Sequence, residues 1–374
     1  MRSILYLTLI FVSISANAKS LTQIIQSDKQ FINFNLSYII ADSNGNVLAQ
    51  QNNNKFVCPA SITKLFTATS AILLLGPNYQ FKTTLYKTGT IKKHTLDGNL
   101  YIKFTGDPSL TQQNLTELIS NLKQLGITTI SGKVYFVANT FNNQPYADGT
   151  TVDDLSYDYA SPISSVTINA NSFGIRLNID PNKTPHASVT QFNSPATLST
   201  KIKLGNSSTC KMNIISNMDN HYILQGCRIK RKEAYIEHFK LAIRNTIKAA
   251  PYFIKKAFSA NKIQINSSPK LAYLNPNATP LVTHRSPKLN VLVHKMLKES
   301  NNIIANSLLK TMGHKYSKSQ GSWANGVAAI KHTLDKKLAI KPDQIKLEDG
   351  AGLSRYNLVT AHATFQLLRA IQKN

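Results

Sequence analysis

The order in which strand-like and helical patterns follow one another constrains the fold of this chain more than any single motif. Apolar residues that alternate with period two predict strands, whereas apolar residues at i, i+3 and i+4 predict helices. These patterns predict a hairpin of strands at 34–42 and 46–51, a helix from about 59 to 75, short strands over 81–172 with a helix near 111–125, an all-β segment at 173–238, and helices at 239–258 and within 288–372. Helical segments near both ends therefore enclose a long β-rich excursion.

The length of 374 residues also predicts more than one hydrophobic core, because single cores rarely grow beyond about 250–300 residues. We expect a multidomain α/β protein with a discontinuous first domain, a β-rich second domain and a small all-β third domain inserted into the second. The expected boundaries are 19–80 with 276–374, 81–172 with 239–275, and 173–238.

The first 18 residues have the pattern of a cleaved export signal. Arg2 precedes a short apolar run at 4–14, and Ala16-Asn17-Ala18 has the small-x-small pattern of a cleavage site. A membrane anchor is the alternative, but the apolar run is shorter than the ~20 residues that span a bilayer. We therefore expect cleavage after Ala18 and a periplasmic mature chain.

The charge of the chain predicts an anionic partner. Lys and Arg number 43 against 18 Asp and Glu, which gives a formal net charge of +25. Nucleic acid, a membrane surface and an anionic cell-wall polymer all fit such a charge, and the run Arg228-Ile229-Lys230-Arg231-Lys232 is the best support for the first. Export argues against nucleic acid and leaves the cell wall favoured, with peripheral membrane contact as a further possibility.

Three cysteines exclude a disulfide-dense scaffold. Cys210 and Cys227 flank a turn-like stretch, 217–221, between two alternating runs, which favours a cross-strand disulfide over two free thiols. Cys58 is the remaining cysteine. It is either a reactive thiol or, as its apolar neighbours Val57 and Pro59 favour, a buried and inert side chain.

The strongest chemical signal is Ser61-Ile62-Thr63-Lys64, at the start of the first long helix. Positions i and i+3 lie on one face of a helix, so the Lys64 amine would stand beside the Ser61 hydroxyl. A serine hydroxyl becomes a nucleophile when an adjacent base takes its proton, and a desolvated lysine can be that base. The alternative is a helix-capping serine with a solvated lysine.

A second polar group, Ser300-Asn301-Asn302, separates two helical stretches at 289–297 and 303–312. Ser300 could join a proton relay with Lys64, and the Asn302 amide could contact a substrate carbonyl. The alternative is that three polar residues simply interrupt a helix.

These two motifs, taken with two more, carry a resemblance to a known family. They are Pro59–Lys64, Gly106-Asp107-Pro108-Ser109-Leu110, Ser300–Asn302 and the run from Asp349 to Leu358. Together they resemble the D-alanyl-D-alanine carboxypeptidase/endopeptidase family, the class C low-molecular-mass penicillin-binding proteins. The resemblance implies a penicillin-recognising serine hydrolase domain that acts on peptidoglycan stem peptides and cross-links through a Ser61 acyl-enzyme. It also implies covalent inhibition by β-lactams.

The resemblance assigns roles to particular residues. Ser61, Lys64, Ser300 and Asn302 would be catalytic, and Asp154 would bind the free amino group of a diaminopimelate side chain. For Asp154 the alternative is an acidic loop residue beside Asp153. The Cys210–Cys227 pair falls where the family places a hairpin in its inserted domain.

The chain departs from the family in one motif. Lys-Thr-Gly on a strand after the Asp349-Gly350 segment would supply a carboxylate-binding lysine and one oxyanion N–H, but the triplet occurs only at Lys87-Thr88-Gly89. We expect those residues to belong to an ordinary strand and the first domain to be incomplete at its C-terminal end. The activity of the chain as written is then doubtful, with an inactive peptidoglycan-binding remnant as the alternative.

No cofactor or metal is indicated, since no metal-binding or nucleotide-binding motif occurs.

Overall fold

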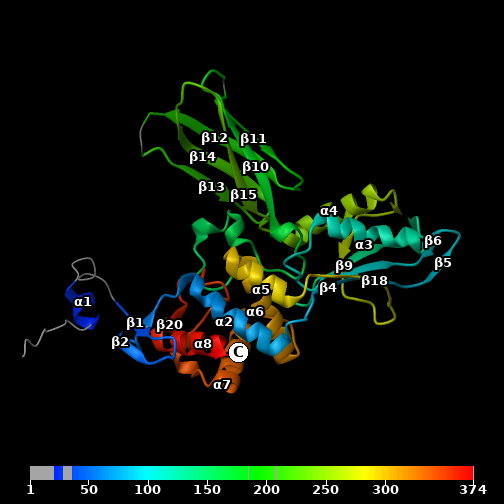
Figure 1. Cartoon of the computed structure of the whole chain (residues 1–374). Coiled ribbons are helices and arrows are strands. Elements are labelled where there is room, and N and C mark those ends of the chain that lie inside the picture. The colour runs from blue at the N-terminus through cyan, green and yellow to red at the C-terminus, as the bar shows by residue number, and fades with distance from the viewer. Residues whose placement is uncertain (1–20, 28–35, 184, 207–208, 374) are drawn as a thin grey trace, which may run out of the picture.

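Three structural units make up the computed structural model, which describes residues 21–27, 36–183, 185–206 and 209–373 (Figure 1). The first unit combines both ends of the chain, the second is a pair of sheets with two helices, and the third is an all-β unit. The predicted leader, 1–18, lies outside the described residues. Within the described part, no helix has the length and apolar character needed to cross a bilayer.

The first unit is a group of helices packed against short strands. Helix α2 contacts α5, α6, α7 and α8, and their buried apolar side chains form one core. Gly76 ends α2 with a positive φ of 90°, a conformation that glycine adopts without strain. The elements are α1 (Leu21–Ser27), β1 (Tyr38–Ala41), β2 (Val47–Gln51), β3 (Phe56–Val57), α2 (Thr63–Leu75), α5 (Leu289–Lys298), α6 (Asn302–Ser317), α7 (Trp323–Leu338), β19 (Ile345–Lys346), β20 (Leu358–Thr360) and α8 (Ala361–Lys373).

The second unit has a five-stranded sheet, β17-β9-β7-β4-β18, and a four-stranded sheet, β16-β8-β6-β5. Helices α3 and α4 pack on each other beside them. Thr111 caps α3 and Asn245 caps α4 with their side-chain oxygens. The elements are β4 (Lys82–Lys87), β5 (Thr90–Lys92), β6 (Thr95–Asp97), β7 (Leu100–Lys103), α3 (Gln112–Gln124), β8 (Thr129–Ile130), β9 (Val134–Val137), α4 (Thr246–Ala260), β16 (Gln264–Ile265), β17 (Lys270–Leu271) and β18 (Thr279–Arg285).

The third unit is the elongated group of strands at the top of Figure 1 and consists of two three-stranded sheets, β11-β10-β15 and β12-β14-β13. Strands β12 and β14 run parallel, while the other pairs are antiparallel. Its buried apolar side chains continue into the core of the second unit, so these two units share one core. The strands are β10 (Ser172–Ile179), β11 (Ala187–Gln191), β12 (Thr197–Gly205), β13 (Met212–Ser216), β14 (His221–Ile229) and β15 (Tyr235–Ala242).

The expected order of elements is largely present, with three corrections. Residues 239–242 belong to strand β15, not to a helix, because they pair with β10; the helix begins only at Thr246. Strand β18 pairs with β4, so residues 279–285 pack with the second unit rather than the first. Cys58 is exposed, not buried, because it lies in the irregular segment between β3 and the turn at Ala60–Ile62 rather than in an element of the core.

The structure contains the predicted disulfide between Cys210 and Cys227. It closes the hairpin of β13 and β14, whose turn lies at 217–220. We expect non-reducing peptide mapping to recover this pair, and Cys58 to react with a thiol reagent in the folded protein. Reduction should destabilise the third unit by about 3 kcal/mol in the chain-entropy model. A bridge containing Cys58 would contradict the assignment.

Candidate active site

Ser61 lies in a short 3-10 turn, Ala60–Ile62, which leads directly into α2. Its side chain is exposed, as a nucleophile must be to reach a substrate. Ala60, just before it, has a φ of 45°, a strained value for a residue with a side chain. The turn thereby presents Ser61 at the N-terminal end of α2, where the helix dipole favours a developing negative charge.

Lys64 stands beside Ser61, as the i, i+3 spacing predicts. Its Nζ lies 3.1 Å from Ser61 Oγ and donates a 2.7 Å hydrogen bond to the carbonyl oxygen of Ala351. The residue is only 2% exposed. Burial lowers the pKa of Lys64 from 10.5 to about 8, against an opposing effect of the Asp349 carboxylate. A sizeable fraction of Lys64 is therefore neutral near physiological pH and can accept a proton from Ser61.

Ser300 completes a three-residue hydrogen-bonded group. Its hydroxyl donates to Ser61 Oγ over 2.9 Å, although the two residues are 239 positions apart. Ser300 lies in the connection between α5 and α6 with a positive φ of 52°, so the backbone is strained where the side chain reaches Ser61 Oγ. The three polar residues do interrupt the helices, but the interruption also places Ser300 at the site.

Asn302, the first residue of α6, contacts the segment around Tyr159 rather than Ser61. Its Nδ2 donates a 2.8 Å hydrogen bond to the carbonyl oxygen of Tyr159. The Tyr159 hydroxyl in turn donates 2.8 Å to Asp154 Oδ1. Asp154 is thus connected to Asn302 through one tyrosine, which the sequence did not single out.

A buried carboxylate organises the loop against which Lys64 rests. Asp349 is 1% exposed and accepts hydrogen bonds from the side chain of Asn357 and from four successive backbone N–H groups, those of Ala351, Gly352, Leu353 and Ser354. Gly352 has a φ of 81°, and a side chain there would overlap the carbonyl of Ala60. From the sequence the motif carries only the resemblance; in the structure it fixes the Ala351 carbonyl that binds Lys64.

The triplet Lys87-Thr88-Gly89 lies in the second unit, where strand β4 ends. Lys87 is paired with Leu100 and Thr279 of the neighbouring strands, and its Nζ donates 2.8 Å to the carbonyl of Gly89. Lys87 is the last residue of an ordinary strand, as expected, whereas Thr88 and Gly89 follow the end of that strand.

The family model of the D-Ala-D-Ala carboxypeptidase 3 (S13) family matches residues 18–374. The chain belongs to this family. The resemblance inferred from the motifs is therefore confirmed.

Two curated relatives show how far the similarity extends. The D-alanyl-D-alanine carboxypeptidase DacB of Haemophilus influenzae is 32% identical over 348 residues, which are 91% of this chain and 71% of that protein. The D-alanyl-D-alanine carboxypeptidase of Actinomadura sp. strain R39 is 24% identical over 88% of this chain and 63% of that protein.

Solved structures of the family share this fold. The crystal structure of penicillin binding protein 4 (dacB) from Haemophilus influenzae matches with a TM-score of 0.81 and 31% identity, over 88% of this chain and 73% of that one. A second structure of that protein, complexed with a β-lactam, matches with a TM-score of 0.77 and 30% identity, over 91% of this chain and 75% of that one. The multidomain α/β fold of penicillin-recognising serine hydrolases is thereby established.

The lowered pKa of Lys64 predicts how acylation depends on pH. If neutral Lys64 is the base, the rate of β-lactam acylation should rise about tenfold per pH unit well below pH 8 and level off above it. Stopped-flow kinetics between pH 5.5 and 9.5 would measure the profile. A rate that keeps rising to pH 10 would mean that Lys64 titrates like a solvated lysine, contrary to its burial.

Proposed function

We propose that this chain is a serine-type D-Ala-D-Ala carboxypeptidase and endopeptidase of peptidoglycan that works through an acyl-enzyme on Ser61. The observation that carries the proposal is the hydrogen-bonded group of Ser61, Lys64 and Ser300 around a buried lysine. Family membership supports it, because both curated relatives above are named D-alanyl-D-alanine carboxypeptidases.

The proposed reaction follows from the positions of these groups. Neutral Lys64 takes the proton of Ser61 as Oγ bonds to the carbonyl carbon of the scissile D-Ala-D-Ala bond. The C–N bond then breaks, and the proton passes through Lys64 and Ser300 to the leaving amine. Water hydrolyses the resulting ester and restores the Ser61 hydroxyl. The Asn302 amide contacts the substrate carbonyl and, through Tyr159, holds the segment that bears Asp154.

We further propose that Asp154 binds the side-chain ammonium of diaminopimelate. Its carboxylate is half-buried and is oriented by Tyr159. The residue before it, Asp153, is exposed and serves as a matched control.

The site of action would be the periplasm, reached by export and cleavage after Ala18. Peripheral contact with the membrane is compatible with the net charge of +25.

Asp154→Asn should lower kcat/KM about tenfold for a stem peptide with a free diaminopimelate amine, since an opposite charge at a partly desolvated site is removed. The same peptide with an acetylated amine should be affected little, and Asp153→Asn should affect neither. Equal losses on both peptides, or a loss with Asp153→Asn alone, would reject the role of Asp154.

The function is tested by measuring release of D-alanine from a diaminopimelate-containing pentapeptide by the purified chain and by its Ser61→Ala variant. Any release by the purified chain, weak or strong, should be absent with Ser61→Ala. A stable acyl-enzyme without turnover would favour the inactive peptidoglycan-binding alternative. Undiminished release by Ser61→Ala would overturn the proposal.

A further inference from the structure

A cavity of about 820 Å³ lies where the three units meet, apart from the catalytic residues. Its walls come from the segments after β9 and around 162–165, from β17 and the residues that follow it, from the start of α4, and from Gln320 of the first unit. Pro145 and Ile163 line both this cavity and a small recess at Asn302 and Tyr159. One layer of chain therefore separates the cavity from the active-site region.

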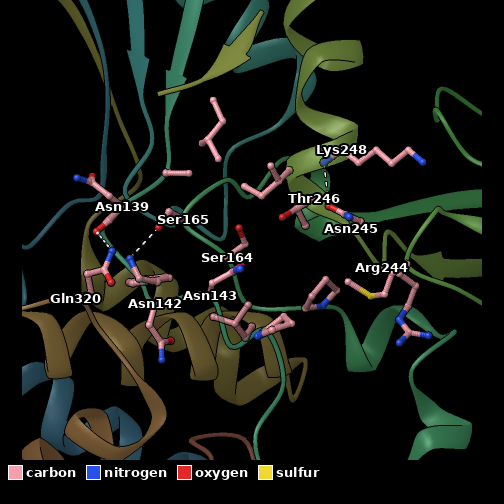
Figure 2. Close-up of a pocket in the computed structure, with 18 of the residues that line it drawn as sticks. Asn139, Asn142, Asn143, Ser164, Ser165, Arg244, Asn245, Thr246, Lys248 and Gln320 are labelled. Carbon is pink, nitrogen blue, oxygen red and sulfur yellow. Dashed lines mark hydrogen bonds between the residues drawn. The ribbon is translucent and has the colours of Figure 1, made fainter. Parts of the chain in front are cut away.

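The lining is rich in amides and hydroxyls and has no acidic side chain among the described residues. Figure 2 shows Asn139, Asn142, Ser165 and Gln320 along one side, with Asn143 and Ser164 in the middle and the start of α4 opposite. Apolar side chains, Leu271 and Ile247 among them, supply the rest of the wall. Such a mixture of apolar surface and a few polar groups is typical of small-molecule sites at domain junctions.

The start of α4 supplies hydrogen-bond donors to this cavity. Asn245 caps only the N–H of Lys248, and the N–H groups of Thr246 and Ile247 have no acceptor within the described chain. Thr246 is only 7% exposed. Its hydroxyl nevertheless has no hydrogen-bond partner among the residues that the structure describes. In Figure 2 that hydroxyl points into the cavity.

Arg244 adds a positive charge at the same end. Its Nε donates 2.9 Å to the Tyr146 hydroxyl and its Nη1 donates 2.9 Å to Ser216 Oγ. Both partners are neutral, and no carboxylate pairs with Arg244 within the described residues, whereas Lys248 is paired with Asp219 at 2.6 Å. The cavity thus has free N–H donors and an unpartnered hydroxyl at the start of α4, with a guanidinium beside them that no carboxylate neutralises within the described residues, a combination that favours a carboxylate.

We propose that this cavity is a second, non-catalytic binding site for a carboxylate-bearing glycopeptide fragment of peptidoglycan. The carboxylate would bind at the start of α4 near Arg244, and the amide side chains opposite would hydrogen-bond acetamido and hydroxyl groups of the sugar. Tyr273, which is 80% exposed at the rim, offers an aromatic face for a pyranose ring. The identity of the ligand rests on the proposed function, but the preference for a carboxylate rests on the cavity itself. A second site of this kind would hold the polymer while the active site cleaves it.

The test is calorimetric titration of the full purified chain with a soluble disaccharide tripeptide, which ends at diaminopimelate and so contains no scissile D-alanine. Asn143 is exposed, and its side chain makes no hydrogen bond within the described residues. Asn143→Trp should therefore fill the cavity without breaking an existing contact and weaken binding at least about tenfold. Thr246→Val removes only the hydroxyl and should weaken it about fivefold, the effect of one hydrogen bond. Asn182→Trp, an equally large change in an exposed loop of the third unit, is the matched control and should have no effect.

Two further comparisons separate this site from the catalytic one. Asp154→Asn and Asn302→Ala should leave cavity binding in place, and a fragment with amidated carboxylates should bind about tenfold more weakly. The inference is overturned if the wild-type chain does not bind at millimolar fragment, if neither cavity variant changes the affinity, if only the active-site variants do, or if amidation has no effect. Failure of the proposed function would show differently, as the absence of β-lactam acylation at Ser61.

Discussion

Replacing Lys64 with methionine should slow β-lactam acylation of Ser61 by about 10²–10⁴-fold, the usual contribution of a general base. Methionine preserves most of the apolar stem and removes only the amine that lies 3.1 Å from Ser61 Oγ. Stopped-flow or quenched-flow measurement of acyl-enzyme formation gives the rate. The residual rate should also lose its inflection near pH 8, because the group that titrates there has been removed.

The chain offers a matched control in a second buried lysine. Lys310 is 0% exposed, burial lowers its pKa to about 7, and its Nζ donates to Asn142 Oδ1 at 2.9 Å and to the Gln144 carbonyl at 2.6 Å. Lys310→Met should therefore lower thermal stability while folded protein still acylates at a near-normal rate. If both variants lost acylation equally, the effect would reflect loss of a buried lysine in general rather than loss of a base.

Asp349→Ala should both destabilise the first unit and slow acylation. The carboxylate accepts five hydrogen bonds, four of them from backbone N–H groups of one loop, and a buried donor left without a partner costs about 1–3 kcal/mol. We expect a loss of at least about 3 kcal/mol, seen as a lower Tm of the first unit by calorimetry. Acylation should slow as well, because the Ala351 carbonyl that binds Lys64 is no longer fixed.

Asp343→Ala is the control for this variant. Asp343 is an exposed carboxylate in the same unit, only six positions earlier, and its removal should change Tm and acylation little, as is usual for surface substitutions. A wild-type Tm and acylation rate in Asp349→Ala would show that the loop keeps its conformation without the carboxylate, contrary to the network described above.

The parts of the site that sequence could predict are those carried by local spacing. Ser61 and Lys64 are three residues apart at the start of one helix, so their proximity follows from helix geometry alone. The interruption at 300–302 can likewise be seen in the sequence, because the helical spacing of apolar residues stops before it and resumes after it. What spacing could not supply is the positive φ of Ser300, which depends on how α5 and α6 pack.

The remaining contacts join segments that are far apart in the chain. The Lys64–Ala351 hydrogen bond spans 287 residues, and Asn302 meets Tyr159 across 143. In the sequence, Tyr159 is only an aromatic residue in a loop, and Asp349 is only an acidic residue before a glycine. Neither pattern by itself indicates a role in the site. Their roles depend on tertiary packing, so only the structure reveals them.

The errors in the fold have the same origin. Residues 239–242 lie immediately before a true helix, and their apolar positions fit a helical period as well as an alternating one; pairing with β10 decides for the strand. Strand β18 likewise belongs to the second unit because it pairs with β4. In the first case a non-local strand pairing overrides a local pattern, and in the second it decides the domain boundary.

The central claim, that Ser61 is the nucleophile activated by Lys64, is tested most directly by peptide mapping after reaction with benzylpenicillin. We predict a single covalent adduct, on the peptide that contains Ser61, and no adduct on the Ser61→Ala variant under the same conditions. An adduct on any other residue, or one that persists in Ser61→Ala, would contradict the account.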